Sequence, residues 1–317
     1  MVETSQIIPI RQLTCDRSDV FTIRWSNTGD QLSIGTSNGF AQLYDSAYEQ
    51  IQLINCQSGA EKMPVSTIRY RPEPPDSVRK PALLLTTCDG GVLHWNLARS
   101  KPINSTRLRN DQFYSSDFNA AGTMYLLGCN EGKIKLFDEN TFSQTSQFCT
   151  FTEGESKGAQ RVFCVKWLND NLFLSAGWDD KVTIWDQRSH NFVREMLGPH
   201  VCGESIDVKE NTVAVGSYHI KDQLTIWDLG SGRNIFTSDL NFEGKKCMPY
   251  CLQFIPETCL FAVGGAGADE VYVYDSNTCR LVNTVRGLGK TVFSMHISVD
   301  KKLAVAVGNH IAIYAFK

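Results

Sequence analysis

Histidines and glycine-rich turns are the residues of this chain whose types and spacing could support catalysis or ligand binding. The six histidines, His94, His190, His200, His219, His296 and His310, show no spacing typical of a metal site. Residues 264–269 are similar to a phosphate-binding loop, but the surrounding pattern predicts two strands and a turn, without the helix N-terminus that binds phosphate. No nucleophile elbow, P-loop or dinucleotide motif occurs. We therefore expect no catalytic residue, no cofactor and no bound metal.

Cysteine usage and charge indicate the compartment. The eleven cysteines are an odd number, and most lie inside strand patterns, where a reducing compartment permits buried free thiols. The net charge of −3 provides no basic field for nucleic acid. The first residues form no basic and apolar leader, and no apolar run is long enough to cross a membrane. We expect a soluble cytoplasmic protein that binds no nucleic acid and does not insert into a membrane.

The elements that must position any site repeat along the chain. Seven aromatic residues, each at the end of an alternating apolar run, recur every 40 to 51 residues: Tyr44, Trp95, Phe137, Trp185, Trp227, Tyr274 and Tyr314. Alternation predicts a strand with one buried face. A second short run that ends in small residues precedes each one, as Leu172–Ser175 precedes Trp185. Each repeat therefore contains at least two adjacent strands.

The most complete repeat, residues 172–186, ends in Trp185-Asp186, and the whole chain resembles the WD40 family. This resemblance implies an all-β fold, a seven-bladed propeller that is one domain over residues 1–317. The expected blades are residues 20–56, 65–108, 113–149, 161–197, 202–240, 250–288 and 292–317. Residues 1–13 are expected to supply the closing strand of the last blade, which would remove an exposed sheet edge.

The repeats depart from the family pattern at a hydrogen-bonded tetrad of His, Ser or Thr, Asp and Trp. The fourth repeat has Ser175, Asp179 and Trp185, but no Gly-His dipeptide precedes any repeat. The nearest match is Gly198-Pro199-His200. We expect this network to be incomplete and the stability of the fold to come mainly from apolar packing between blades.

Aromatic residues stand at the first position of five of the seven expected inner strands: Phe21, Tyr114, Phe163, Tyr250 and Phe293. The resemblance implies that they lie on the rim, where aromatic residues anchor protein partners; packing against neighbouring blades is the alternative. Trp178, Tyr218 and His219 lie in turns on the same expected face, and Arg161 ends the loop that enters the fourth blade. These nine residues form the predicted partner site. Elaborated loops at 153–161, 217–223 and 242–249 favour the sector of blades four to six.

The fourth position of the expected inner strands is polar in every repeat: Arg24, Arg69, Asp117, Lys166, Asp207, Gln253 and His296. Groups of opposite charge next to one another can form hydrogen bonds that compensate their burial. We interpret this ring as a polar lining, with a site for an ion or small anion as the alternative.

The expected function is a non-enzymatic scaffold for protein interactions, as a subunit of a hetero-complex. Residues 173–188 also resemble the box of WD40 substrate receptors of cullin-4 ubiquitin ligases, which implies that Arg188 contacts the adaptor on the opposite face. Residues 198–228 resemble WD proteins of ciliated and flagellated eukaryotes, which implies a ciliary or axonemal role. A hydrolase or lyase built on a propeller is the alternative from another class.

Overall fold

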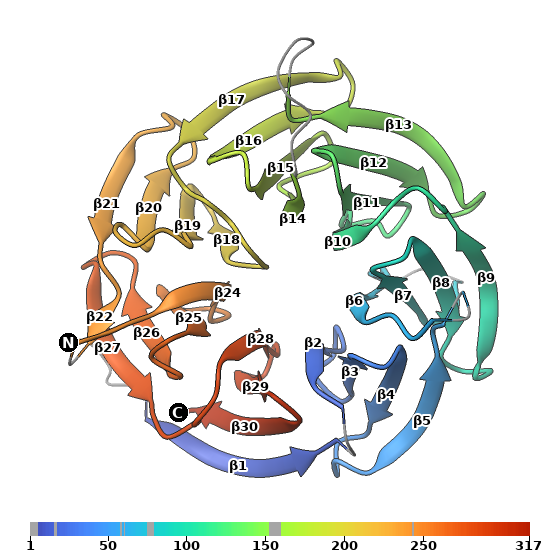
Figure 1. Cartoon of the computed structure of the whole chain (residues 1–317), viewed down its shortest axis with the longest axis horizontal. Coiled ribbons are helices and arrows are strands. Elements are labelled where there is room, and N and C mark those ends of the chain that lie inside the picture. The colour runs from blue at the N-terminus through green and yellow to red at the C-terminus, as the bar shows by residue number, and fades with distance from the viewer. Residues whose placement is uncertain are drawn as a thin grey trace. The chain divides into compact units, whose positions relative to one another are not determined.

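Seven four-stranded antiparallel sheets make up the described part of the chain, with one two-stranded hairpin beside them. The computed structural model describes residues 6–15, 18–57, 59, 61–74, 79–151, 160–242 and 244–317. The sheets are the blades of a β-propeller (Figure 1). The predicted all-β, seven-bladed fold is therefore confirmed.

The first six blades each run from an inner to an outer strand along the chain. The first contains β2 (Val20–Trp25), β3 (Leu32–Thr36), β4 (Phe40–Tyr44) and β5 (Gln50–Asn55), and the second contains β6 (Val65–Tyr70), β7 (Ala82–Thr87), β8 (Gly91–Asn96) and β9 (Lys101–Arg107). The third contains β10 (Phe113–Phe118), β11 (Met124–Cys129), β12 (Lys133–Asp138) and β13 (Ser143–Cys149), and the fourth contains β14 (Val162–Trp167), β15 (Leu172–Gly177), β16 (Lys181–Asp186) and β17 (Asn191–Leu197).

The fifth blade contains β18 (Ile206–Lys209), β19 (Thr212–Gly216), β20 (Leu224–Asp228) and β21 (Asn234–Ser238). The hairpin of β22 (Asn241–Phe242) and β23 (Lys245–Lys246) follows it. The sixth blade contains β24 (Met248–Phe254), β25 (Leu260–Ala266), β26 (Val271–Asp275) and β27 (Arg280–Val285). The seventh contains β28 (Val292–Ile297), β29 (Lys302–Val307), β30 (His310–Phe316) and β1 (Ile7–Thr14).

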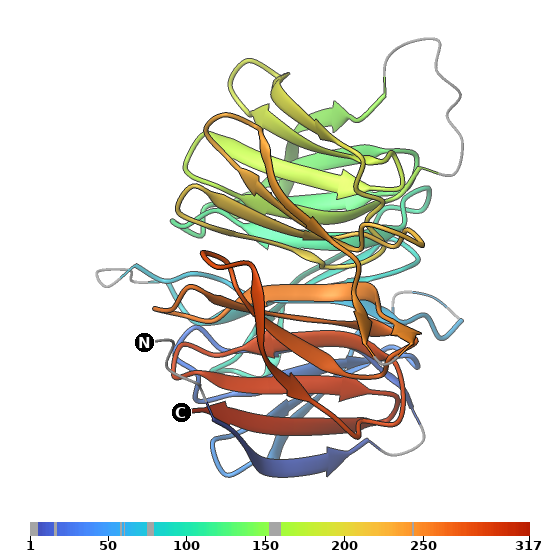
Figure 2. The ribbon, with the colours of Figure 1, turned by 90° about the vertical axis from the view of Figure 1, so that its left-hand side faces the viewer.

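The strand β1 closes the seventh blade, as the sequence predicted. It pairs antiparallel with β30, from Ile7 opposite Phe316 to Thr14 opposite His310. Backbone hydrogen bonds of 2.9 Å in both directions between Gln6 and Lys317 extend this ladder. Both views show β1 beside β30 (Figures 1 and 2). Because β30 is paired on both sides, it presents no free edge to another chain.

Burial decreases from the second strand of a blade to its outer strand, which explains the sequence patterns. All six residues of β7, Ala-Leu-Leu-Leu-Thr-Thr, are buried, because this strand is covered on both faces. The outer strand β9, Lys-Pro-Ile-Asn-Ser-Thr-Arg, is exposed at six of its seven positions. The continuous apolar runs in the sequence are therefore second strands, and the polar runs are outer strands.

Two compact units divide the chain, and each has its own apolar core. Residues Met1–Leu32 and Val201–Lys317 form the terminal unit, and Ser33–His200 form the central unit. In the central unit Phe148 of the third blade packs against Phe173 of the fourth, with ring centroids 5.0 Å apart. In the terminal unit Val273 of the sixth blade and Val305 of the seventh belong to one buried cluster. Apolar packing between blades, as expected, stabilises both units.

Polar side chains also join neighbouring inner strands. At four of the seven polar positions, the side chain accepts a hydrogen bond from a backbone N–H of the next blade. The N–H donor is in each case the fifth residue of the inner strand of that next blade. The N–H donors are Trp167 to Asp117 (2.9 Å), Phe254 to Asp207 (2.7 Å), Ile297 to Gln253 (2.7 Å) and Trp25 to His296 (3.1 Å). These bonds favour a structural role for the polar ring, since they hold adjacent blades in register.

The fourth blade retains only part of the expected tetrad. The indole Nε1 of Trp185 donates a hydrogen bond of 2.8 Å to Ser175 Oγ. Asp179, at the turn after β15, has no histidine partner among the described residues, and its Oδ1 atom makes no hydrogen bond. Burial raises the pKa of its carboxyl to about 6. The fourth blade therefore keeps a largely buried carboxyl whose usual histidine is missing.

Candidate functional site

Four of the predicted rim aromatics occupy β-bulges at the start of inner strands. In the pairing of the first two strands, the register skips Tyr114, Phe163, Tyr250 and Phe293. A bulge leaves its extra residue out of the ladder and turns its side chain away from the sheet. The preceding residue points into the core instead, as Val162 and Val292 do, which are 2% and 0% exposed. The repeated bulge thus separates a core side chain from a rim side chain.

In the central unit the rim aromatics form one continuous row, which we call the central row. Tyr114 contacts Phe163, with centroids 5.0 Å apart, and Phe163 contacts Trp178 at 5.5 Å. Trp178 stacks on His200, with centroids 6.1 Å apart and planes 13° from parallel. All four rings are partly exposed. The structure therefore brings three predicted residues together and adds His200 to them.

Arg161 lies over two rings of the central row. Its guanidinium carbon is 4.6 Å from the centroid of Trp178 and 5.3 Å from that of Tyr114. Contacts of this kind attract a cation to the face of an aromatic ring and restrain its side chain. Arg161, which the sequence placed at the end of a loop, is thus part of the same surface as the aromatics.

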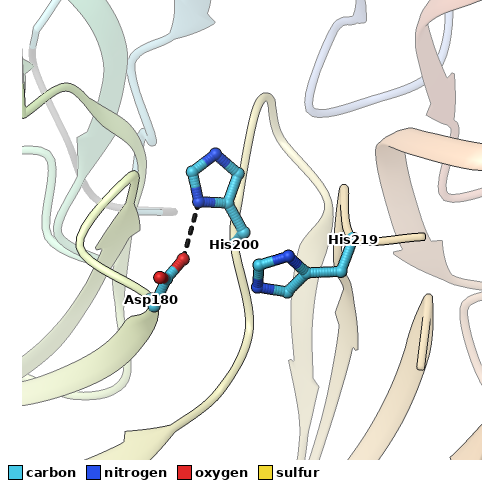
Figure 3. A group of neighbouring side chains, drawn as sticks. All are labelled: Asp180, His200 and His219. Atoms are coloured by element: carbon cyan, nitrogen blue, oxygen red, sulfur yellow. Dashed lines mark hydrogen bonds and ion pairs between the residues drawn. The ribbon is translucent and has the colours of Figure 1, made fainter. Parts of the chain in front are cut away.

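His200 is held by a carboxylate of the same unit. Its Nδ1 atom lies 2.6 Å from Asp180 Oδ1, in the turn between β15 and β16 (Figure 3). Figure 3 also shows His219, which comes from the β19–β20 connection of the terminal unit. The residue noted in the sequence as the nearest substitute for the tetrad histidine therefore bonds Asp180 and not Asp179.

In the terminal unit a second set of rings forms the terminal row. Phe21 stacks on Phe293 at 6.0 Å, Phe293 contacts Tyr250 at 5.6 Å, and Tyr250 contacts Tyr218 at 5.3 Å. The hydroxyl of Tyr250 donates a hydrogen bond of 3.3 Å to that of Tyr218. Burial is the main cause of the raised pKa of Tyr250. Phe21 and Phe293 remain 42% and 41% exposed, so the row offers apolar area to solvent.

The connection that carries Tyr218 and His219 is fixed by hydrogen bonds. Gln223 Nε2 donates to the carbonyl of His219 (2.8 Å), and Lys246 Nζ donates to that of Ile220 (2.7 Å). The exposed side chain of His219 therefore projects from a defined backbone.

The expected loops lie partly outside the described residues. Most of the loop at 153–161 falls in residues 152–159, which are not described, and one residue of the loop at 242–249 is not described either. The remaining part of the latter contains β22 and β23, a hairpin that the sequence did not predict. The loop at 217–223 has the bonds given above.

Arg188 is engaged by its own repeat. Its Nε and Nη2 atoms lie 3.1 and 2.8 Å from the two carboxylate oxygens of Asp186. These bonds hold the pKa of Asp186 at about 2. The guanidinium is exposed, but part of its donor capacity is used within the repeat.

Sequence reasoning did not identify an acidic residue at the start of the fifth inner strand as a partner of the polar ring. Glu204 occupies the position held by aromatics in five other blades, and its carboxylate accepts a hydrogen bond from Arg24. The observed strand β18 begins two residues later, at Ile206. The signal in the sequence was the residue type, since Glu204 is acidic where five other repeats have an aromatic residue.

Burial limits the reactivity of several thiols. All eleven cysteines are free, and six of them are buried. Burial raises the pKa of Cys56 and of Cys247 to about 12, so these thiols are protonated at neutral pH and poor nucleophiles. They act as small apolar core residues.

The comparisons with known proteins agree with the fold. The family model described as "WD domain, G-beta repeat" matches residues 147–186. The WD repeat-containing protein srw1 of Schizosaccharomyces pombe is 25% identical over 169 residues, 52% of this chain and 27% of that protein. The WD repeat-containing protein 91 homolog of Dictyostelium discoideum is 24% identical over 173 residues, which are 54% of this chain and 21% of that protein. Coronin-7 of Pongo abelii is 22% identical over 134 residues, which are 41% of this chain and 13% of that protein.

The seven four-stranded blades and these matches define a β-propeller of the WD repeat class. The chain is a WD40-repeat protein that forms a seven-bladed propeller. It spans about a quarter or less of the length of the curated relatives it matches. WD40 propellers bind proteins and are generally not catalytic. The described residues include no helix with the length and apolar character needed to span a membrane.

Proposed function

We propose that this chain is a non-enzymatic scaffold that binds protein partners through the central row and the terminal row. The observation that carries the proposal is the repeated bulge, which turns aromatic side chains out of the inner strands while they still support one another. Rigid aromatic side chains contribute large contact areas with little loss of side-chain entropy. The proposal includes a role as a subunit of a hetero-complex, which this surface supports.

Packing between blades was the alternative explanation for the rim aromatics. The rows do pack internally, but they remain partly exposed, and Phe21 and Phe293 expose about two fifths of their area. A side chain that served only the core would be buried as fully as Val162, one position earlier than Phe163. Partial exposure at a preorganised surface favours a contact role.

The test is proximity labelling in the native cells with wild-type protein and the triple variant Trp178→Ala/Tyr218→Ala/Tyr250→Ala. Circular dichroism first verifies that both proteins fold. We expect the variant to lose a discrete set of neighbours, because it removes two rings of the terminal row and the central indole of the central row. An unchanged set of neighbours would contradict the proposal.

A matched control removes exposed apolar side chains from outer strands. Phe192, Ile235 and Leu53 are each 55% to 58% exposed and lie on β17, β21 and β5. The variant Phe192→Ala/Ile235→Ala/Leu53→Ala should keep the neighbours of the wild type. If it lost the same neighbours, general surface hydrophobicity and not the rows would explain binding.

The narrower roles inferred from the sequence stay hypotheses within this proposal. A ciliary scaffold predicts that the labelled neighbours are axonemal proteins. A cullin-4 receptor predicts that Arg188→Ala abolishes adaptor binding, although Asp186 already engages this guanidinium. Adaptor binding that is unchanged in Arg188→Ala would exclude the receptor role.

A further inference from the structure

The backbone of Arg161 is held in place from several sides. Its carbonyl accepts a hydrogen bond of 3.2 Å from the N–H of Trp178, and the residue forms an isolated bridge with Asn130. The carbonyl also lies so close to Gly177 that a Cβ atom there would be 1.8 Å from it. Only glycine permits this approach. The position from which the Arg161 side chain starts is therefore fixed by the fold.

The guanidinium of Arg161 has aromatic neighbours in the described part of the chain. Trp178 and Tyr114 lie within 4.6 and 5.3 Å of its central carbon. Among the described residues, none forms a hydrogen bond or ion pair with the Arg161 side chain. An arginine that is restrained by rings but lacks an acceptor keeps its donors available at low entropic cost.

Two acidic residues near this cluster already have cationic or histidine partners. Asp180 bonds His200, and Asp89 forms an ion pair of 2.9 Å with Arg107. Arg161 and Asp89 both act on the thiol of Cys88, which places their charges in the same neighbourhood. Neither Asp180 nor Asp89 forms an ion pair with Arg161. Charge complementarity favours an anionic occupant.

We propose that Arg161, with Tyr114 and Trp178, binds a carboxylate side chain of an acidic peptide segment in a partner protein. The inference depends on the proposed scaffold function and specifies the chemistry of the partner. The two oxygens of a carboxylate match the paired N–H donors of a guanidinium. The flanking rings cover the aliphatic part of the same side chain and keep water away from the pair.

Fluorescence anisotropy of a labelled, capped oligoglutamate peptide tests the proposal at low ionic strength. Wild-type protein should bind it and should not bind the oligoglutamine peptide of equal length. Arg161→Ala should weaken binding by about ten-fold or more, since it removes a charge-assisted, bidentate contact. The affinity of Arg161→Lys for oligoglutamate should lie between those of the wild type and Arg161→Ala, because lysine keeps the charge without the paired donors.

Arg109 provides the matched control, because it is an exposed arginine of the same unit. Binding that is unchanged in Arg109→Ala supports a specific site, and an equal loss in Arg109→Ala and Arg161→Ala would overturn it in favour of general electrostatics. Absence of oligoglutamate binding overturns the proposal. The proposal would also be overturned if a phosphoserine peptide bound through Arg161 and oligoglutamate did not bind. The preferred anion would then be phosphate and not carboxylate.

The scaffold function and the acidic-peptide site can fail separately. If the triple rim variant loses neighbours in proximity labelling but Arg161→Ala keeps all of them, the partner does not use this arginine and the scaffold function stands. If neither variant loses neighbours, both proposals are wrong. Circular dichroism of each arginine variant excludes unfolding as the cause of a loss.

Discussion

Replacing Asp179 by asparagine should stabilise the protein at neutral pH. Asp179 lies at the turn after β15, where a histidine would normally bond it, and its Oδ1 atom has no hydrogen-bond partner among the described residues. Burial raises the pKa of the carboxyl from 3.8 to about 6, against smaller opposing contributions that include Lys181 and Thr150. Asparagine has almost the same shape and carries no charge to bury.

The magnitude follows from the difference between the two pKa values. A pKa that rises from 3.8 to about 6 on folding costs the ionised form about 3 kcal/mol at 1.36 kcal/mol per pKa unit. Partial exposure of the carboxyl reduces this figure, so we expect a gain of about 2 kcal/mol for Asp179→Asn at pH 7.5.

The sign of the pH dependence is fixed by the direction of the shift. Between about pH 4 and pH 6 the folded protein holds the proton of Asp179 while the unfolded chain loses it, so the wild type becomes less stable as the pH rises. Above pH 6 the penalty is constant. The advantage of the variant should therefore be absent near pH 4, grow through this interval and level off above it.

Urea unfolding of both proteins between pH 4 and pH 8 measures this difference. Other carboxyl groups titrate in both proteins, so their contributions cancel in the comparison. Asp170→Asn, an exposed carboxyl of the same unit, should show no such pH-dependent gain. A difference between wild type and Asp179→Asn that does not vary with pH would refute the reasoning.

Three further predictions concern the contacts that join strands and blades. Asp207→Ala removes the acceptor for the N–H of Phe254 and should destabilise the fold by about 2 kcal/mol in urea unfolding, because a buried donor loses its partner. Glu139→Gln should lower the free energy of unfolding by about 3 kcal/mol in the same assay, because it removes the charge of a buried carboxylate that is paired with Arg71. The carboxylate lies 3.1 Å from Arg71 Nη1 and 3.0 Å from His94 Nε2. The contact with His94 is within ion-pair distance but lacks hydrogen-bond geometry. Deletion of β1 frees the edge of β30 and should convert monomer into larger species, measured by size-exclusion chromatography with light scattering.

Each of these changes has a control in an exposed place. Asp19→Ala should alter stability by less than about 0.5 kcal/mol, and so should Glu131→Gln, whose side chain is 49% exposed beside Lys133. A truncation that starts at Gln6 keeps β1 and should remain monomeric. Equal losses in Asp207→Ala and Asp19→Ala would show that the bond between blades is not significant. A stable monomer without β1 would show that closure is not needed.

The fold was predictable because its pattern is local and repeated. The period of the terminal aromatics, the small residues of the second strands and the polar outer strands all follow from the burial of single strands within one blade. The closing strand was predictable too, since the last repeat lacks its outer strand and an apolar run precedes the first one. The hairpin of β22 and β23 was not, because two-residue strands have no period.

The candidate site was predictable in its residue types but not in its contacts. The five aromatics at the first position of the inner strands were visible in the sequence. Their contacts were not, because Tyr114 and Phe163, or Tyr250 and Phe293, come from different blades more than forty residues apart. The place of Arg161 over two rings depends on the close approach of its carbonyl to Gly177.

The sequence by itself determined the repeat, the strand pattern, the closure and the missing histidine of the tetrad, since these depend on which residues follow one another. Tertiary structure alone decided that the rim aromatics occupy bulges and stack in rows, and that His200 bonds Asp180. It also decided that Asp117 and Asp207 join neighbouring blades. The physical reason is that strand register and the approach of adjacent sheets set the direction of a side chain, and both arise only when the sheets pack.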